Sequence, residues 1–212
     1  GTGRISTTSN TSSFRRYSAR FNNEYEMLKG RLTIGENFTM TNLRMRDVNS
    51  TYGFLVMPPN IPVHDNNGGW GGVAMALGMD DFNNPVRDLE INKDNKGNFL
   101  KILGTGYANL KILDNLAFKT QFGLDYNMWY DRTIQHKWKE AGGKSSDING
   151  VTQNNWQNVG RTWTNTLIYN LKFGKNLFDI LGGIETYRYV YEFTNAYRSD
   201  ILLESRDYAY LS

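Results

Sequence analysis

The side chains between residues 116 and 131 alternate between mainly apolar and mainly polar character. Successive side chains of a β-strand point to opposite faces, so this pattern predicts a strand with one apolar and one wet face. At roughly 3.3 Å per residue the strand would extend about 50 Å, whereas soluble strands rarely exceed about 10 residues. The two sets are Leu116, Phe118, Thr120, Phe122, Leu124, Tyr126, Met128 and Tyr130, and Ala117, Lys119, Gln121, Gly123, Asp125, Asn127, Trp129 and Asp131.

The same alternation recurs in pairs of segments that are joined by short turns. Lys29-Gly30, residues 113–115 and residues 174–176 are the turn sequences. Short connections between alternating segments predict antiparallel hairpins. We therefore expect about six strands, at residues 17–27, 32–40, 99–112, 116–131, 157–173 and 177–193.

The other connections are long, at about residues 43–98 and 137–156. Since every second connection is short, an up-and-down meander would place all the tight turns at one end and the long loops at the other. Outer-membrane β-barrels have this layout, with short periplasmic turns and longer extracellular loops. The pattern thus favours membrane-spanning strands with the two long loops outside the cell.

Aromatic residues near the expected strand ends suit the girdles that such barrels carry at the two membrane interfaces. Tyrosine is also a good strand former, so these residues are supporting observations only. They are Tyr126, Trp129, Tyr130, Trp163, Tyr169, Tyr187, Tyr189 and Tyr191.

Composition narrows the class of protein further. The chain has no run of about 18 apolar residues, so no transmembrane helix is expected. It has no cysteine, and its net charge is only +3. No run of basic residues is long enough to suggest nucleic-acid binding. Six strands are too few to close a bacterial barrel, which needs at least about 8, and open edges would leave backbone groups unpaired in lipid. We expect a piece of a larger barrel.

Several stretches of the chain, taken in order, resemble the SusC/RagA family of TonB-dependent outer-membrane transporters. The resemblance covers nearly the whole chain. Each stretch is weakly specific, and their order and spacing carry the likeness. They are FRRYSARFN at 14–22, LKGRLTIG at 28–35, MPPNIPVHD at 57–65, NPV at 84–86, DNLAFK at 114–119 and LGGIE at 181–185.

This resemblance implies a parent protein with a barrel of about 22 strands around an N-terminal plug. Residues 1–212 would be an internal slice of that barrel, without the plug or the TonB-contacting segment. The family imports glycans, and in some members peptides, across the bacterial outer membrane with energy delivered by TonB. A SusD-like lipoprotein covers the extracellular mouth. The expected partners are therefore this lipoprotein, the TonB complex through the missing plug, the substrate and outer-membrane lipid.

No enzymatic chemistry is expected from the residues. The two histidines, His64 and His136, belong to no catalytic or zinc-binding motif. Residues 92–97 begin like a calcium loop, but Lys96 stands at a ligand position and Leu103 where the bidentate glutamate belongs, so a turn is the better interpretation. We expect no catalytic residue, no cofactor and no bound metal.

Three tryptophans are the candidates for contact with substrate or partner: Trp70, Trp129 and Trp138. Trp70 lies in a glycine-rich stretch, where it could approach a ligand or simply occupy a loop tip. Trp129 interrupts a polar face, so it could line the substrate path, pack on a plug or join a girdle. Trp138 lies at the second long loop and carries the same ambiguity.

Two other classes of function remain open at this stage. A soluble β-sandwich that binds carbohydrate would also be rich in tyrosine and asparagine, although its strands should be shorter. A passive outer-membrane porin would share the alternating wall. The importer is favoured over both because of the family resemblance.

Overall fold

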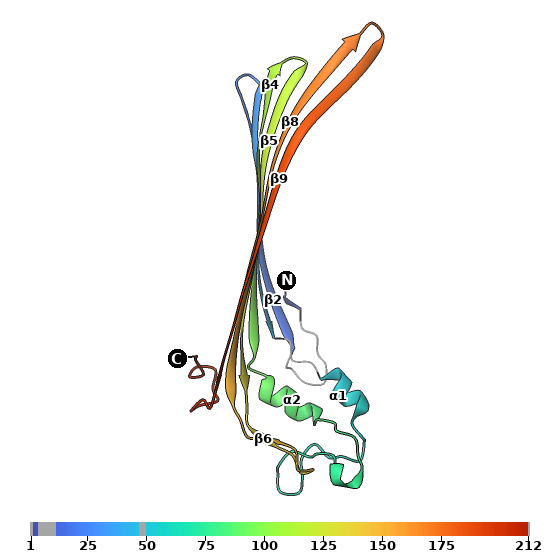
Figure 1. Ribbon diagram of the computed structural model, residues 1–212, viewed down its shortest axis with the longest axis vertical. Helices are drawn as coiled ribbons and strands as arrows, with labels where there is room; N and C mark the ends of the chain where they lie inside the picture. Colours follow the sequence, from blue (N-terminus) through green and yellow to red (C-terminus); the bar gives the residue numbers. More distant parts are fainter. Residues whose placement is uncertain (1, 4–11, 47–49, 212) are drawn as a thin grey trace.

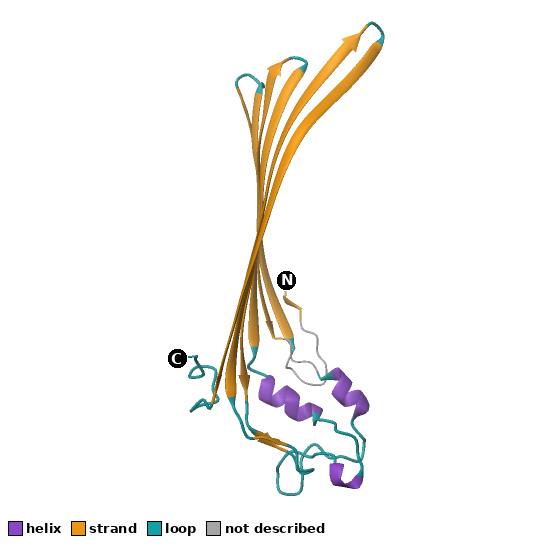
Figure 2. Cartoon of the chain, in the orientation of Figure 1, coloured by secondary structure: helices purple, strands orange, loops and turns teal. Residues whose placement is uncertain are grey.

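The computed structural model describes residues 2–3, 12–46 and 50–211. Its long strands are β2 (Ser13–Met27), β3 (Leu32–Arg46), β4 (Lys96–Leu113), β5 (Leu116–Gln135), β8 (Gly150–Phe173) and β9 (Asn176–Ser199). The short elements are β1 (Thr2–Gly3), α1 (Thr51–Val56), a 3-10 helix (Met75–Leu77), α2 (Pro85–Asn92), β6 (Trp138–Lys139) and β7 (Ser145–Ser146). The helices gather at one end of the molecule (Figure 2). None of the helices in these ranges is long and apolar enough to cross a membrane.

The six long strands form one antiparallel sheet in the order β2-β3-β4-β5-β8-β9, with β1 paired beside β2. Each long strand pairs with the next long strand along the chain, so the predicted all-β up-and-down meander of about six strands is confirmed. Only the two-stranded β6-β7 sheet lies outside it in the described part of the chain. The described residues therefore do not form the second large sheet that a β-sandwich requires.

All three tight turns lie at one end of the sheet, and the long connections lie at the other (Figure 1). The hairpins also reach progressively further out. Leu32 at the first turn pairs with Leu110, and β4 continues to Leu113; Leu116 at the second turn pairs with Tyr169, and β8 continues to Phe173. A regular stagger of this kind is the arrangement that tilted strands adopt in a barrel wall.

The strands begin and end near the predicted residues on the turn side but extend further on the loop side. β5 continues to Gln135, and β8 begins at Gly150, so the second long connection covers only residues 136–149. The first covers residues 47–95. Apolar alternation fades in these extensions, whereas the backbone ladder continues. Since alternation reports the surroundings of the side chains and the ladder does not, the sequence pattern underestimates strand length.

The register gives the whole sheet two distinct faces. We call the side that carries Phe122 the apolar face and the side that carries Gln121 the polar face. Phe122 lies opposite Gly106 of β4 and Trp163 of β8, which extends the apolar face to the neighbouring strands. Large side chains there are 40 to 69% exposed, and they include Phe21, Tyr25, Met27, Ile34, Met40, Phe122, Trp163, Leu167, Phe178, Ile180 and Ile184.

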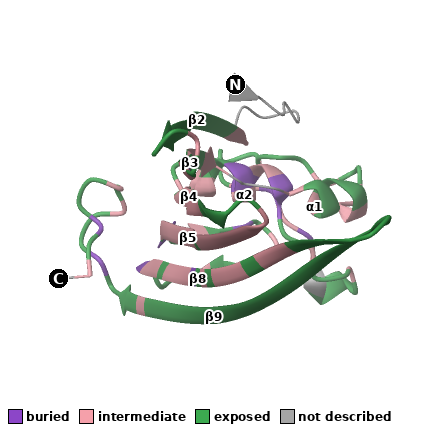
Figure 3. Ribbon diagram, turned by 90° about the horizontal axis from the view of Figure 1, so that it is seen from above, coloured by how far each residue is buried: buried purple, intermediate pink, exposed green. Residues whose placement is uncertain are grey.

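The buried interior of the molecule lies at the loop end. Among the described residues the buried hydrophobic ones lie in the long connections, at the loop ends of strands or in the C-terminal segment: Val73, Leu89, Ile134, Val151, Ile201 and Ala209. Two layers cover this end of the sheet. The C-terminal segment lies on one side of it, and α1 and α2 lie on the other (Figures 1 and 3).

The outer edges of the sheet are open among the described residues. β9 pairs only with β8 along its 24 residues, and β2 has only the two-residue β1 on its far side. A long edge with unpaired N–H and C=O groups is a template for further strands. Open edges of this kind, at β2 and at β9, are expected of a sheet that forms part of a larger barrel.

Candidate functional site

A row of aromatic side chains crosses the polar face near its loop end. Phe99 lies opposite Trp129, Trp129 opposite Trp156, and Trp156 opposite Phe193 on four successive strands of the sheet. The ring centroids of Phe99 and Trp156 are 6.0 Å apart, and those of Trp156 and Tyr191 are 6.4 Å apart. These separations are typical of interacting aromatic pairs. We call these five residues the aromatic row.

The Trp129 side chain lies against the neighbouring strand of the sheet and does not project away from it. A Cβ atom at Gly97, on the neighbouring strand β4, would overlap its indole ring. Its Nε1 donates a hydrogen bond of 2.5 Å to Asp131 Oδ1. The register places Trp129 on the polar face, opposite Phe99 and Trp156. One side of the ring packs on the strand backbone, and the residue as a whole is half-buried.

The same arrangement recurs along the polar face. In each case a tyrosine ring covers a glycine of the neighbouring strand: Tyr107 covers Gly35, Tyr187 covers Gly160, and Tyr197 covers Gly150. Glycine permits this because it has no side chain to hold the ring away. These three rings therefore lie against the neighbouring strand.

Tyr187, Tyr189 and Tyr191 were predicted to suit a girdle, but they face the polar side of β9. The prediction failed because tyrosine fits either face of a strand, so its presence near a strand end does not identify the face. The register instead leaves Tyr126, Tyr130, Trp163 and Tyr169 on the apolar face.

Hydrogen-bonded polar side chains flank the aromatic row on both sides. On the loop side, Asn195 donates to Asn154 at 2.6 Å, and Asn154 donates to Asp131 at 3.0 Å. On the turn side, Asn127 donates to both Asn158 and Asp125 at 2.8 Å. The Lys101 ammonium lies 3.7 Å from Asp125. Flat aromatic surface bordered by amides and carboxylates can contact a ligand that has both apolar and hydroxyl or amide groups.

The two long connections are locked together by a buried ion pair. Arg87 of α2 donates to Glu140 at 2.5 Å, and both side chains are at most 2% exposed. The Arg87 guanidinium also lies 3.4 Å from the centre of the Trp138 ring. Trp138 therefore acts as a platform for this arginine through a cation–π contact.

Asn84 also links the two connections, through hydrogen bonds of its backbone and its side chain. Its side-chain oxygen accepts hydrogen bonds from the backbone N–H groups of Val86 and Arg87, which caps the start of α2. Its amide donates to two backbone carbonyls, those of Val63 and Gly71, and its own N–H donates to Glu140 at 2.9 Å. One residue thus connects three parts of the first connection to the second.

Trp70 lies in the same assembly. Its ring stacks on His64 with centroids 4.7 Å apart, and its carbonyl accepts a hydrogen bond of 2.9 Å from the N–H of Ala141. The structure therefore brings Trp70 and Trp138 together at residues 138–141. Trp129 lies apart from them, on the strand.

The C-terminal segment is held to the sheet by polar contacts around a small core. Ile201 and Ala209 pack with Ile134 and Val151. Arg206 donates to the carbonyl of Arg132 at 2.8 Å, and Arg132 donates to the carbonyl of Arg206 at 2.7 Å. Burial, followed by the neighbouring Arg132 guanidinium, lowers the pKa of Arg206.

Glu204 accepts three hydrogen bonds in this segment. They come from Asn149 Nδ2 at 2.9 Å, from the backbone N–H of Lys137 at 3.2 Å, and from the His136 ring, whose Nδ1 lies 2.9 Å from Oε2. Partial burial raises the pKa of Glu204, but these hydrogen bonds lower it by more, so the net pKa lies below that of an ordinary glutamate. His64 thus stacks on the Trp70 ring, and His136 contacts the Glu204 carboxylate. Within the described ranges no group of three or more His, Cys, Asp or Glu residues is placed to hold a metal ion.

Sequence patterns did not single out Arg87, Glu140 or the capping role of Asn84. A capping residue followed by proline is a known start signal for a helix, so Asn84-Pro85 could have located α2. No local signal connects residue 87 with residue 140, because their contact depends on how two separate loops fold together.

Comparison with known proteins supports the likeness at the level of fold. No protein-family model and no curated protein matches the chain. The structure is similar to the RagAB peptide importer in the open-open state, with 20% identity and a TM-score of 0.72, covering 94% of this chain and 22% of that chain. It is also similar to the RagAB peptide transporter, at 20% identity and a TM-score of 0.71, and to the importer in the closed-closed state, at 19% and 0.70. Both of these matches cover 94% of this chain and 23% of the other.

The predicted resemblance to SusC/RagA is confirmed by these matches as a likeness of fold. The chain spans less than a quarter of the solved chains that it matches. Its six-stranded meander corresponds to one segment of them. These neighbours are described as a peptide importer and a peptide transporter.

Proposed function

We propose that this chain forms part of the barrel wall of a TonB-dependent nutrient importer in the bacterial outer membrane. The apolar face would contact lipid, and the polar face would line the lumen. The two long connections would lie outside the cell, where a SusD-like lipoprotein would cover them. The plug and the TonB-contacting segment would come from other parts of the parent protein, and the substrate would be a glycan or a peptide.

One observation carries this proposal: the described residues form a single staggered sheet with open edges, which exposes large apolar side chains along one face and a mixture of charged, amide and aromatic side chains along the other. In water that apolar face would be an extended hydrophobic surface, which soluble proteins avoid. In lipid it is the expected exterior of a barrel. The fold likeness to RagAB supports the same interpretation.

Within this proposal the aromatic row is the best candidate for substrate contact. Trp129 is its central residue, since the indole lies along the wall and its neighbours Asp131 and Asn127 belong to the polar ladders on either side. Trp70 and Trp138 serve the loop assembly first, because their rings pack on His64 and Arg87. We propose that these two tryptophans affect the binding of substrate or lipoprotein indirectly, because they hold the loops in their shape.

Site-directed spin labelling tests the wall assignment. Single cysteines are introduced at Phe122 or Gln121 of the full-length protein in its native outer membrane; this chain has no cysteine of its own. The label at residue 122 should be relaxed by oxygen, which concentrates in lipid, and the label at residue 121 by a water-soluble nickel chelate. Equal accessibility at both positions would contradict the membrane assignment.

Substrate uptake separates an importer from a porin. A glycan or peptide that supports growth should enter cells that carry both the transporter and TonB, and uptake should stop when TonB is deleted. Replacing Trp129 with alanine should lower uptake while the amount of protein in the outer membrane stays constant. Undiminished uptake without TonB would favour the passive porin.

A further inference from the structure

Cations gather on the apolar face toward its loop end. From the register, the cations of the strands on this face are Arg15, Arg44, Arg46, Lys96, Arg132, Arg161, Arg188 and Arg198, and the acids are Glu36 and Glu192. All of these cations lie on the loop side of the row that runs across the sheet through Phe122. No strand residue of this face between that row and the tight turns is charged. The apolar face is therefore basic at one end only.

Two pairs of arginines lie directly opposite each other on neighbouring strands of this face. Arg15 of β2 is opposite Arg44 of β3, and Arg161 of β8 is opposite Arg188 of β9. All four side chains are exposed, and none forms a side-chain hydrogen bond or an ion pair with another described residue. Like charges directly opposite each other destabilise a sheet. An anion that bridges each pair would remove this repulsion.

Polar side chains that lie opposite each other on the polar face behave differently. Thr164 donates a hydrogen bond of 2.8 Å to Glu185, which lies directly opposite it. Asn170 donates to Asp179 across the same two strands at 2.6 Å. Opposite positions on the polar face thus combine a donor with an acceptor, whereas the two arginine pairs combine donors only.

The acids of the apolar face do not compensate the arginine pairs. Glu36 accepts a hydrogen bond of 2.9 Å from Asn23, and Glu192 accepts one from Gln157. Glu192 lies four residues beyond Arg188 on β9, which corresponds to about 13 Å along the strand. Both carboxylates are therefore held by amides at some distance from the guanidinium groups.

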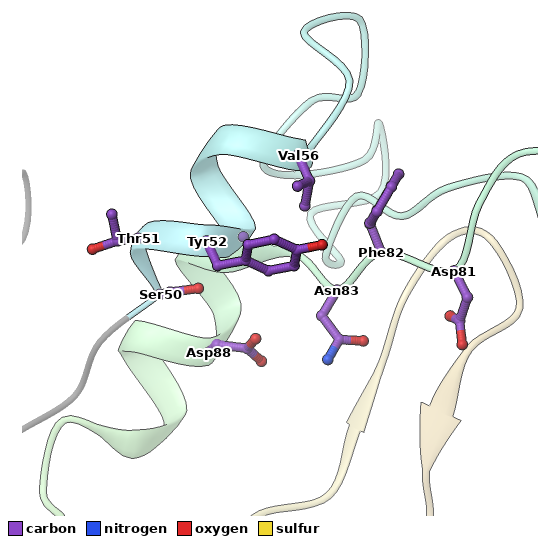
Figure 4. A pocket seen from close by; sticks show the side chains of 9 residues that line it. Ser50, Thr51, Tyr52, Val56, Asp81, Phe82, Asn83 and Asp88 are labelled. Carbon is purple, nitrogen blue, oxygen red and sulfur yellow. The ribbon is translucent and has the colours of Figure 1, made fainter.

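Carboxylates at the loop end, by contrast, have cationic partners within the chain. A cavity of about 620 Å³ lies beside Tyr52, between α1 and the start of α2 (Figure 4). Of the two aspartates that line it, Asp81 pairs with Lys144 and Asp88 pairs with Arg87. The uncompensated charge of the molecule thus lies on the apolar face of the sheet.

A third pair of opposite cations, Lys96 and Arg132, has protein contacts of its own. Arg132 donates to the carbonyl of Arg206 at 2.7 Å, and its guanidinium lies 4.5 Å from the centre of the Tyr210 ring. The C-terminal segment therefore covers this pair. No described segment covers the other two pairs in the same way.

The two uncovered pairs lie at the same height in the wall. Each arginine is 12 residues from the end of its strand at the tight turn: Arg15 from Met27, Arg44 from Leu32, Arg161 from Phe173 and Arg188 from Asn176. Twelve residues extend about 40 Å along a strand, or about 30 Å above the turns at a tilt of about 40°. The apolar band of an outer-membrane barrel is about 25 Å tall. Both pairs therefore fall at the outer boundary of that band.

Exposed apolar side chains continue from each pair toward the tight turns. Below the β8–β9 pair these are Trp163, Phe122 and Ile184, and below the β2–β3 pair they are Tyr17 and Met40. A membrane lipid has the same order of groups along its length, a charged headgroup followed by hydrocarbon chains. The sequence of charged and apolar surface therefore matches a lipid that stands beside the wall.

We propose that the two arginine pairs bind phosphate groups of a phosphorylated lipid in the outer leaflet of the outer membrane. One phosphate lies between the two guanidinium groups of each pair, and the acyl chains extend along the apolar face. Directly opposite side chains have Cβ atoms about 5 Å apart, so both guanidinium groups can reach one phosphate. Guanidinium groups bind phosphate through two parallel hydrogen bonds, which an ammonium group cannot do. The lipid site rests on the proposed function for the orientation of the wall in the membrane.

Native mass spectrometry of the detergent-purified full-length protein tests this binding. The probes are lipid A and the same lipid after enzymatic removal of its phosphates. Arg161→Gln together with Arg188→Gln should remove one bound lipid A relative to the wild type, and Arg15→Gln together with Arg44→Gln another. Each arginine should account for about fivefold in affinity at its site, as expected for a cation next to an anionic headgroup. The dephosphorylated lipid should bind the wild type as weakly as lipid A binds the variants.

Arg198→Gln is the matched control for Arg188→Gln. Arg198 lies on the same face of the same strand, 10 residues further from the tight turn, and it is opposite Val151 and not another arginine. Its replacement removes the same charge, but it should leave the binding of lipid A unchanged. The spin-label pattern of residues 121 and 122 verifies that each variant keeps the wall intact.

Three outcomes would overturn the lipid site: equal binding of lipid A and its dephosphorylated form, full binding in both double variants, or an equal loss in Arg198→Gln. Complete displacement of lipid A by millimolar inorganic phosphate at constant ionic strength would assign the arginines to a free anion, and would also overturn it. Equal accessibility of the spin labels would remove the membrane assignment together with this site. Different accessibility without binding of lipid A would remove the lipid site alone.

Discussion

The strand region and the loop end of this chain are stabilised in different ways. Between the turns and the loop ends, the sheet is held by backbone ladders, and the buried positions within it are Gly35 and Gly160, each beneath a tyrosine ring. At the loop end, by contrast, charged and amide groups are fully buried. Arg87 is 1% exposed and Glu140 is 2% exposed.

This difference shows which part of the chain buries side chains through contacts of its own. The sheet buries almost nothing between its two faces, so its apolar face needs an external medium or neighbouring strands to cover it. The loop end is organised by specific polar contacts within the chain, such as those of Arg87, Glu140 and Asn84. The loop end can therefore hold its shape through its own contacts, whereas the apolar face of the sheet has no cover within the described residues.

The largest effect should follow from breaking the buried ion pair at the loop end. Arg87→Ala would leave Glu140 charged and buried without its partner, which costs about 3 to 5 kcal/mol. Hydrogen exchange should show residues 81–92 and 138–144 opening together, while the ladders of β4 and β5 stay protected.

Lys93→Ala is the control for this variant. Lys93, the residue after α2, pairs with Glu90 of that helix, but the two side chains are 55% and 49% exposed. Exposed pairs of this kind contribute at most about 1 kcal/mol. Unchanged exchange in Arg87→Ala would show that the two connections hold their shape without the ion pair.

A smaller effect is expected in the sheet, where glycine makes room for a ring. Gly97→Ala should force the Trp129 indole off the wall, at a cost of about 1 to 3 kcal/mol for overpacking. Tryptophan fluorescence and urea stability of the full-length protein in membranes would report the change. Gly106→Ala is the control, because a Cβ there meets no atom within 4 Å. Equal behaviour of the two variants would contradict the packing of Trp129 on Gly97.

The smallest effect concerns acid stability of the C-terminal segment. The pKa of Glu204 is lower in the folded state than its ordinary value of 4.5, so the unfolded state binds more protons near that pH. Its contribution is therefore present above about pH 4.5 and is lost as the pH falls through the folded pKa. Because Glu204 is partly exposed, we expect less than about 1 kcal/mol.

Proteolysis of residues 200–211 between pH 6 and 3 measures this contribution. Cleavage in the wild type should increase toward the acid end, by at most about fivefold. Glu204→Gln should show higher cleavage at pH 6 and a weaker dependence on pH. A steeper dependence in Glu204→Gln would assign the acid sensitivity to another group.

The sequence predicted the strands better than the residues that shape the loops. Alternation from residue 116 to 131 fixed both the existence and the facing of β5, because a period of two is a local property of the backbone. β9 was different. Its tyrosines indicated a strand but did not identify the face on which they lie, and the register with β8 places Tyr187 and Tyr191 on the polar face. Trp138 was noticed as an aromatic residue, but its arginine partner was not.

The sequence by itself determined the meander, the position of its tight turns and the existence of two faces, since each depends on residues close together along the chain. The tertiary structure alone decided the pairing of Arg87 with Glu140, the covering of Gly97 by Trp129 and the cavity beside Tyr52. These contacts join residues from different strands or loops, and residues 87 and 140 are 53 positions apart. Their geometry exists only once the sheet has set the spacing and stagger of the strands that carry the loops.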